Sequence, residues 1–260
     1  MNIGNTTFSV DIGYIIDAER PVIAYDAEVK DQLCPLYHEH PRAQLLYAVS
    51  GIIKVWTDEG IWVVPPMQAV WIASGVSHKA QVTGRTRLKN LFFDPSVRHL
   101  LPKSCFVLRV SPLLKELIDK FCATDDGRRQ KRLANVIIDE LAEAKQEPLC
   151  LPVSGHRYVS SVVSALMAEP FSRKTLEEWA DTAGTSPRNF SRIFLKETGM
   201  TFGAWRTKVK ILYSIEMIQK GKSVTETAYD LGYQSISAFI ESFRKETGVS
   251  PKKYFSKGRS

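Results

Sequence analysis

The chain has 260 residues, with 35 basic and 28 acidic side chains and an apolar fraction of 44%. This length holds one large or two ordinary globular domains, and the composition excludes disordered, collagen-like and low-complexity proteins. No run approaches the ~18 apolar residues of a membrane span, and the residues after Met1 lack an export signal. Four scattered cysteines form no C-x-x-C pair, which favours free thiols. We therefore expect a cytoplasmic protein without a membrane anchor.

The net charge of +7 is distributed unevenly along the chain. Residues 1–155 carry 18 basic and 18 acidic side chains, whereas residues 156–260 carry 17 basic and 10 acidic ones. The second segment therefore holds the whole excess. Such an asymmetry predicts a polyanionic partner for that segment alone.

The first third of the chain has the pattern of short strands. β-branched and aromatic residues dominate five segments, and turn residues separate them at intervals of about 8–12 residues. The segments are 44–49, 52–57, 61–64, 69–72 and 88–93. Short strands at this spacing predict an antiparallel sandwich or barrel.

Helical periodicity replaces the strand pattern after Ser111. Apolar residues recur every three or four positions in 113–121 and 133–144, which predicts two amphipathic helices. The segment 146–152 contains two prolines and no period, which predicts a linker. We expect an α+β chain in three parts: a jelly-roll-type antiparallel β-barrel at 1–105, a helical dimerisation and linker segment at 106–155, and an all-α domain at 156–260.

The C-terminal part contains a degenerate internal repeat. Each copy has a short helix with a central alanine, a glycine after the helix, a serine, and a second helix with two phenylalanines four residues apart. The matching positions are Ala180 and Ala228, Gly184 and Gly232, Ser186 and Ser235, Phe190/Phe194 and Phe239/Phe243. Glycine permits a left-handed turn and serine can cap the next helix. The pattern predicts two helix-turn-helix units, at about 175–196 and 223–245.

The segment 202–219 between the two units predicts one uninterrupted helix. Such a helix is about 27–30 Å long at 1.5 Å per residue, close to the ~34 Å between successive major grooves on one face of DNA. We therefore expect the second helices of both units to enter adjacent major grooves of double-stranded DNA. A helical repeat without DNA-binding activity is the alternative.

The repeat resembles the DNA-binding domain of AraC/XylS-type transcriptional regulators. The resemblance rests on Ala180 and Gly184, the turn 232–235, the second phenylalanine pair and the segment 247–254. It implies that the second helix of each unit contacts base edges, and that the first unit dominates specificity. Carried over by position, the base-contact residues are Arg188, Ser191, Arg192, Ile236, Ser237, Ala238 and Glu241. The expected phosphate contacts are Ser186, Arg206, Lys208, Lys210, Ser235, Lys252 and Lys253.

The N-terminal part is similar to a cupin-like effector domain, on the segments 35–51 and 73–78. The expected effector pocket comprises His38, His40, Gln44, His78, Trp56 and Trp71. His38 and His40 are two residues apart and so face one side of a strand. Gln44 stands where metal-binding cupins carry a carboxylate, and an amide is a poor ligand for a divalent transition metal. Two interpretations stay open: a site for an organic effector, or a zinc or nickel site formed by His38, His40 and His78. The expected function requires no cofactor.

The sequence thus predicts a transcription factor that responds to an effector and acts as an activator or a repressor. We expect the chain to form a homodimer through the helices near 111–145. RNA polymerase is the other expected protein partner. A metal-dependent cupin enzyme with an accessory helical domain, and a non-specific DNA binder, are the alternatives from other classes.

Overall fold

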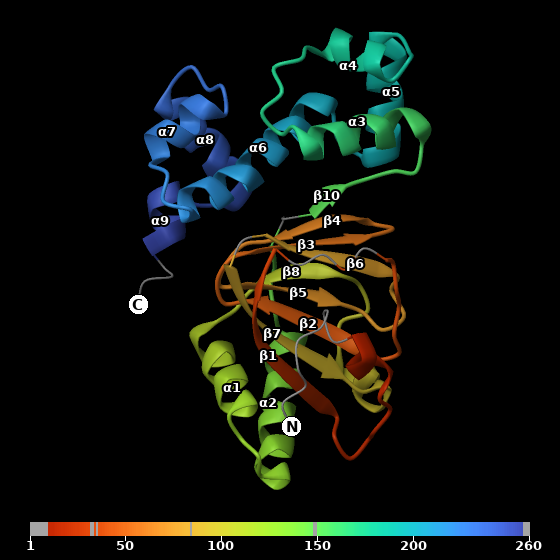
Figure 1. Ribbon diagram of the computed structural model, residues 1–260, viewed down its shortest axis with the longest axis vertical. Helices are drawn as coiled ribbons and strands as arrows, with labels where there is room; N and C mark the ends of the chain where they lie inside the picture. Colours follow the sequence, from red (N-terminus) through yellow and green to blue (C-terminus); the bar gives the residue numbers. More distant parts are fainter. Residues whose placement is uncertain (1–9, 32–33, 35, 84, 148–149, 257–260) are drawn as a thin grey trace. The chain divides into compact units, whose positions relative to one another are not determined.

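The computed structural model describes residues 10–31, 34, 36–83, 85–147 and 150–256. The chain divides into two compact units, one of residues 1–57 and 62–149 and the other of residues 58–61 and 150–260 (Figure 1). No helix in the described part is both long and apolar enough to cross a membrane.

The strands form two sheets, as predicted. The six-stranded sheet has the order β1-β7-β2-β5-β8-β9, and a four-stranded sheet has the order β10-β4-β3-β6. The pairings β1–β7, β7–β2, β2–β5, β5–β8, β8–β9 and β3–β6 are antiparallel. The strands are β1 (Val22–Lys30), β2 (Ala43–Ala48), β3 (Ile52–Thr57), β4 (Gly60–Val64), β5 (Gln68–Ile72), β6 (His78–Thr83), β7 (Arg85–Phe93), β8 (Phe106–Arg109), β9 (Gln146–Glu147) and β10 (Cys150–Pro152).

Register decides which side chains of the six-stranded sheet share a face. Gln44 of β2 lies opposite Ile72 of β5, and Leu45 lies opposite Trp71. Because side chains alternate along a strand, Gln44 and Trp71 point to opposite faces of the sheet.

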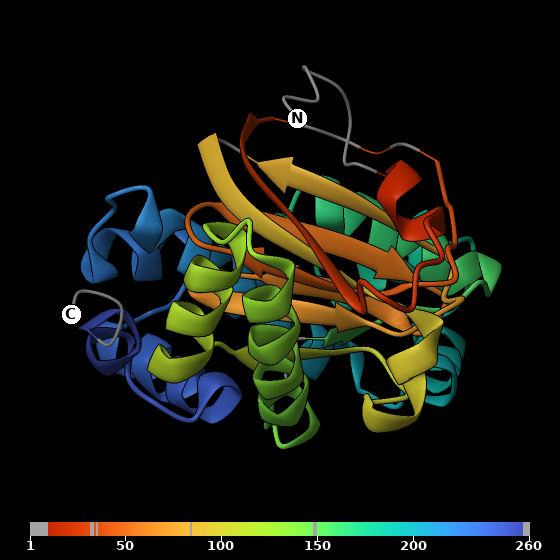
Figure 2. The same cartoon turned by 90° about the horizontal axis from the view of Figure 1, so that it is seen from below.

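The helices α1 (Pro112–Cys122) and α2 (Gly127–Ala142) lie side by side against the six-stranded sheet (Figures 1 and 2). Both helices were predicted from their periodicity. The ammonium group of Lys89 in β7, only 5% exposed, bridges Asp26 of β1 at 3.0 Å and Asp119 of α1 at 2.8 Å. This buried bridge connects α1 to the sheet.

The structure differs from the sequence prediction at several strands. It adds β1 and β6, and it places Phe106–Arg109 in the sheet as β8, paired with β5. The segment expected to be a linker forms β9 and β10, while Pro148 and Leu149 lie outside the described residues. A short extended segment can complete a sheet edge without hydrophobic periodicity of its own, because the pairing uses only backbone groups.

The second unit contains all the remaining α-helices of the described chain. They are α3 (Arg157–Ala168), α4 (Leu176–Thr182), α5 (Pro187–Thr198), α6 (Phe202–Gln219), α7 (Val224–Asp230), α8 (Ile236–Thr247) and α9 (Pro251–Ser256). Helix α6 has the bounds that the sequence predicted, and it connects the α4–α5 pair to the α7–α8 pair (Figure 1).

Both helix pairs have the local geometry of a helix-turn-helix unit. Gly184 and Gly232 adopt positive φ values of 72° and 77°, a region in which glycine carries no steric penalty. The side chains of Ser186 and Ser235 accept hydrogen bonds from backbone amides at the starts of α5 and α8. The matched alanines and phenylalanines of the repeat are all fully buried: Ala180, Ala228, Phe190, Phe194, Phe239 and Phe243. The structure thus confirms both predicted units.

Candidate functional site

Helix α5 presents two arginines to solvent. Arg188 and Arg192 are exposed, and Ser191 between them is half-buried. Phe190 and Phe194 turn inward on the same helix, which leaves the arginines on the outer face. The face therefore combines positive charge with hydrogen-bond donors suited to base edges.

A chain of side-chain hydrogen bonds orients Arg192. The guanidinium donates to Oδ1 of Asn189 at 2.9 Å, and Nδ2 of Asn189 donates to Oγ1 of Thr185 at 2.8 Å. Asn189 was not among the predicted base-contact residues. Its position three residues before Arg192, on the same side of the helix, is the signal that could have identified it.

Helix α8 presents a less basic surface at the matching positions. Ser237, Ala238 and Glu241 are exposed, and Ile236 is half-buried. A methyl-bearing side chain can contact the methyl group of thymine, and a glutamate can accept a hydrogen bond from cytosine N4. The two outer faces thus differ in chemistry although their backbones repeat.

The three basic residues of α6 are half-buried: Arg206, Lys208 and Lys210. Burial lowers the pKa of each. Arg206 donates to the backbone oxygens of Lys174, at 2.8 Å, and of Ser172, so its guanidinium holds the segment before α4. In this structure, Arg206 acts inside the domain rather than at a free surface. In contrast, Lys252 and Lys253 of α9 are exposed.

Three histidines of the first unit converge at one point. One ring nitrogen of each of His38, His40 and His78 lies within 4.8 Å of the other two. His38 and His78 form an isolated antiparallel bridge, with backbone N–H···O distances of 3.0 and 2.9 Å, and their ring centroids are 4.4 Å apart. Glu39, between His38 and His40 in the sequence, is exposed.

The Nδ1 atom of each ring faces a backbone carbonyl two residues away. The distances are 2.6 Å from His40 to the oxygen of Arg42, 2.8 Å from His78 to that of Val76, and 3.4 Å from His38 to that of Leu36. A carbonyl oxygen only accepts hydrogen bonds, so a neutral ring in this position carries its proton on Nδ1. The Nε2 atoms then hold the lone pairs.

Burial favours the neutral form of two of these rings. His40 is 4% exposed and His78 is 2% exposed. Burial lowers the pKa of His40 and lowers that of His78 to about 3. Gln44 lies beside them, with its Oε1 3.2 Å from Nε2 of His40 and its Nε2 donating to Oδ1 of Asn90 at 2.9 Å.

The two tryptophans of the expected pocket lie elsewhere. Thr57 is paired with His78 across β3 and β6, so Trp56, the preceding residue, points to the other face of that sheet. Trp71 points away from Gln44 for the same reason. The structure therefore brings together His38, His40, Gln44 and His78 without the tryptophans.

Cys34 and Gly13 also contact the histidines. Cys34, which the sequence analysis treated only as a free thiol, has its Sγ 3.7 Å from Nδ1 of His38, and burial raises the pKa of this thiol. Gly13 of the 3-10 helix η1 (Val10–Tyr14) packs directly on His40, because a Cβ atom there would lie 2.4 Å from Cγ of the ring. Neither contact is evident from sequence spacing.

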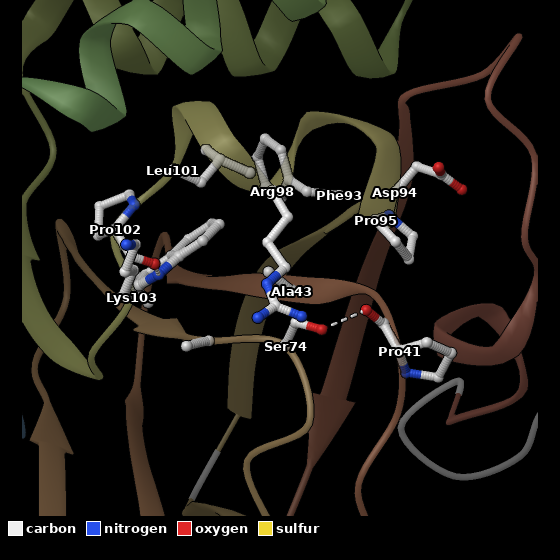
Figure 3. Close-up of a pocket in the computed structure, with 12 residues that line it drawn as sticks. Pro41, Ala43, Ser74, Phe93, Asp94, Pro95, Arg98, Leu101, Pro102 and Lys103 are labelled. Atoms are coloured by element: carbon white, nitrogen blue, oxygen red, sulfur yellow. Dashed lines mark hydrogen bonds between the residues drawn. The ribbon is translucent and has the colours of Figure 1, made fainter.

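Trp71 instead lines a separate recess of about 110 Å³ on the outer face of the six-stranded sheet (Figure 3). Ala43, Phe93 and Leu101 are among its apolar lining residues. Arg98, from the 3-10 helix η2 (Pro95–Leu100), extends over Ala43 toward Ser74, while the carboxyl group of Asp94 points away (Figure 3).

The recess carries positive charge that its own residues do not neutralise. Arg98 and Lys103 are exposed, and neither side chain has an ion pair within the described ranges. Asp94 is already engaged with Arg42 at 3.1 Å. The recess thus combines an aromatic wall with two available cations.

Comparisons with known proteins agree on both units. A family model described as an AraC-like ligand binding domain matches residues 21–148, and one described as a helix-turn-helix domain matches residues 179–257. The HTH-type transcriptional regulator NimR of Escherichia coli (strain K12) is 36% identical over 231 residues, covering 87% of this chain and 84% of that protein.

Two solved structures are also similar. ToxT from Vibrio cholerae is 11% identical, with a TM-score of 0.39, over 91% of this chain and 98% of that one. The DNA-binding domain of AdpA in complex with a target DNA is 28% identical, with a TM-score of 0.36, over 38% of this chain and 91% of that one.

Proposed function

Because the chain belongs to the AraC family of helix-turn-helix transcriptional regulators, we propose that one chain reads two successive major grooves of DNA. The observation that carries this proposal is helix α6, which alone connects the two helix-turn-helix units. Its 18 residues span about 27 Å, which suits α5 and α8 to adjacent grooves on one face of the duplex.

Helix α5 supplies most of the base specificity in this proposal. Arg192 is exposed and held by Asn189, and a guanidinium can bind O6 and N7 of guanine through two hydrogen bonds. Arg188 and Ser191 complete the reading face. Ile236, Ser237, Ala238 and Glu241 of α8 make weaker or more permissive contacts, because none of them carries a cation.

In this proposal, most phosphate contacts come from α9 and from the ends of α5 and α8. Ser186 and Ser235 lie at the N-termini of α5 and α8, where backbone amides favour anions, and Lys252 and Lys253 are exposed on α9. Lys208 and Lys210, which are half-buried in α6, remain candidate phosphate contacts. Arg206 is left out of the set, because its two terminal nitrogens already donate to carbonyl oxygens.

The AraC-like ligand-binding domain makes the protein responsive to an effector, and the recess of Figure 3 is our candidate for its small-molecule site. An aromatic wall beside Arg98 and Lys103 suits a small aromatic carboxylate. Effector binding changes DNA binding only if the effector prefers one of two arrangements of the protein.

The enzyme alternative has no support in the comparisons, and we propose that the chain has no catalytic activity.

We also propose a cytoplasmic homodimer that pairs through α1 and α2 and acts with RNA polymerase at promoters. Leu113 of α1 is 54% exposed and Val136 of α2 is 41% exposed, and such apolar side chains can be covered by a second subunit. Sedimentation of the wild-type chain and of Leu113→Glu tests the dimer. A monomeric wild-type chain, or an unaffected variant, contradicts it.

The two-groove proposal is tested by hydroxyl-radical footprinting with the full chain. A duplex selected from a random library serves as the target, and we expect two protected patches per bound chain, about one helical turn apart on one face. Protection of a single groove per chain contradicts the proposal. Equal affinity for selected and random duplexes supports a non-specific binder instead.

A further inference from the structure

The arrangement of the three histidines has a chemical consequence of its own. Their Nδ1 atoms all face backbone carbonyls, those of Leu36, Arg42 and Val76. Histidines that bind metal ions commonly donate their second ring N–H to a carbonyl, which orients the ring and leaves the other nitrogen as ligand. Three independent rings share this orientation here.

We propose that the N-terminal unit binds one divalent transition-metal ion of the zinc type through Nε2 of His38, His40 and His78. One ring nitrogen of each histidine already lies within 4.8 Å of one ring nitrogen of the other two. Zinc binds imidazole nitrogens at about 2.0–2.1 Å in tetrahedral geometry, which requires nitrogen separations of about 3.4 Å. Small rotations of the rings supply the difference.

The surroundings of His40 favour a cation between the rings. Its Nε2 lies 3.2 Å from Oε1 of Gln44, whose amide nitrogen is engaged by Asn90. In the neutral ring with its proton on Nδ1, both of these atoms are acceptors, so two lone pairs face each other without a proton between them. A bound cation removes this repulsion.

The fourth coordination position has no strong protein ligand. Gln44 offers only a neutral amide oxygen, which transition metals bind weakly compared with imidazole. Three protein ligands with an open position are typical of sites that exchange a small molecule, whereas purely structural zinc sites usually have four. The proposed ion therefore completes its coordination with water or another exchangeable small ligand.

Cys34 is not a ligand in this proposal. Its Sγ faces Nδ1 of His38 at 3.7 Å, on the side of the ring opposite to Nε2. The Cys34 thiol therefore provides a matched control, because it is buried next to the site without belonging to it.

The experiment uses the full chain, stripped of metal by a chelator and titrated with Co²⁺ as a spectroscopic probe. We expect one equivalent to bind, with visible d–d absorption, displacement by Zn²⁺, and no thiolate-to-metal charge transfer. His78→Asn and His40→Asn should weaken Co²⁺ binding at least about 10-fold. Cys34→Ser, and His99→Asn at the exposed η2 histidine, should bind as the wild type does.

Several outcomes overturn the proposal. Substoichiometric binding, or equal binding by His40→Asn, identifies an adventitious ion only. A charge-transfer band that disappears in Cys34→Ser assigns the thiol as a ligand and contradicts the three-histidine site. Since a variant can misfold, ¹⁵N NMR of the wild type provides a second measurement. Zn²⁺ should change the ¹⁵N chemical shifts of the Nε2 atoms of three histidines. DNA takes no part in either assay, so failure of the two-groove proposal leaves this test unchanged.

Discussion

The guanidinium of Arg192 donates a hydrogen bond of 2.9 Å to Oδ1 of Asn189, one turn earlier on α5. Asn189 is itself bound to Thr185 in the turn of the helix-turn-helix unit. The turn therefore orients the exposed arginine before any DNA is present. Preorganisation of this kind lowers the entropy cost of binding.

Arg192→Ala should remove discrimination at one base pair, at a cost of about 1–3 kcal/mol for that base. Asn189→Ala should produce a smaller loss at the same base pair, because it frees the arginine without removing it. Competition binding with four duplexes that differ only at that base measures both effects. If Arg192→Ala weakens all four duplexes equally, the arginine binds phosphate instead.

Lys252→Ala should weaken binding to all sequences alike and reduce the slope of log K against log salt by about 0.9, the value for one phosphate contact. The exposed ammonium group on α9 makes it a phosphate contact in our proposal. Binding assays at four salt concentrations measure the slope. Lys145→Ala, which alters an exposed lysine of the other unit, should leave it unchanged, and an equal change in both variants would argue against the assignment.

Gly13→Ala should weaken metal binding at the histidines. The new Cβ would lie 2.4 Å from Cγ of His40, so either the ring or η1 must move. We expect a several-fold loss of Co²⁺ affinity in the titration described above. Gly155→Ala, at a position with open space around the added Cβ, is the control, and wild-type affinity in Gly13→Ala would show that the ring orientation does not matter.

Asp94→Asn should destabilise the N-terminal unit. Arg42 and Asp94 have exposed side-chain fractions of 0% and 2%, and Arg42 also donates to the carbonyl oxygens of Ile15 and Phe92. Removing one partner of a buried ion pair costs about 3–5 kcal/mol. Urea unfolding at pH 7 measures the loss, and a cost below about 1 kcal/mol would contradict the importance of the pair.

The same ion pair predicts a dependence of stability on pH. Burial opposes ionisation of Asp94, but hydrogen bonds from Ser96 and Asp17 and the charge of Arg42 outweigh it and lower the pKa of this carboxyl below 3.8. The pair therefore stabilises the fold above about pH 4, and the contribution is lost as the pH falls through the lowered pKa. The free energy of unfolding, measured as a function of pH, should differ between wild type and Asp94→Asn at neutral pH. The two values should converge at low pH.

Arg98→Ala should abolish binding of a small aromatic carboxylate in the recess. Benzoate is the probe, and thermal shift measures binding by the wild type and the variant. Lys103→Ala should weaken binding as well, because both cations belong to the recess, whereas Arg128→Ala, at an exposed position outside it, should not. Binding of benzoate that persists in Arg98→Ala would place the small-molecule site elsewhere.

Local patterns in the sequence were sufficient to predict the C-terminal unit. The repeated glycines, serines and phenylalanines specify both helix-turn-helix units, and the bounds of α6 follow from its uninterrupted helical pattern. Each of these features acts within one or two helical turns, because capping, left-handed turns and apolar periodicity are local properties. Asn189 also lies within this range, although only the structure identified its role.

The sequence alone also determined that His38, His40 and His78 belong together, through their resemblance to known motifs. Only the tertiary structure decided that the three Nδ1 atoms face carbonyls, that Gly13 packs on His40, and that Trp56 and Trp71 lie away from the histidines. The tryptophans depend on strand register, since a shift of one residue moves a side chain to the opposite face of a sheet. Register is set by pairing between segments far apart in the chain, and so the sequence near Trp71 could not reveal which site it lines.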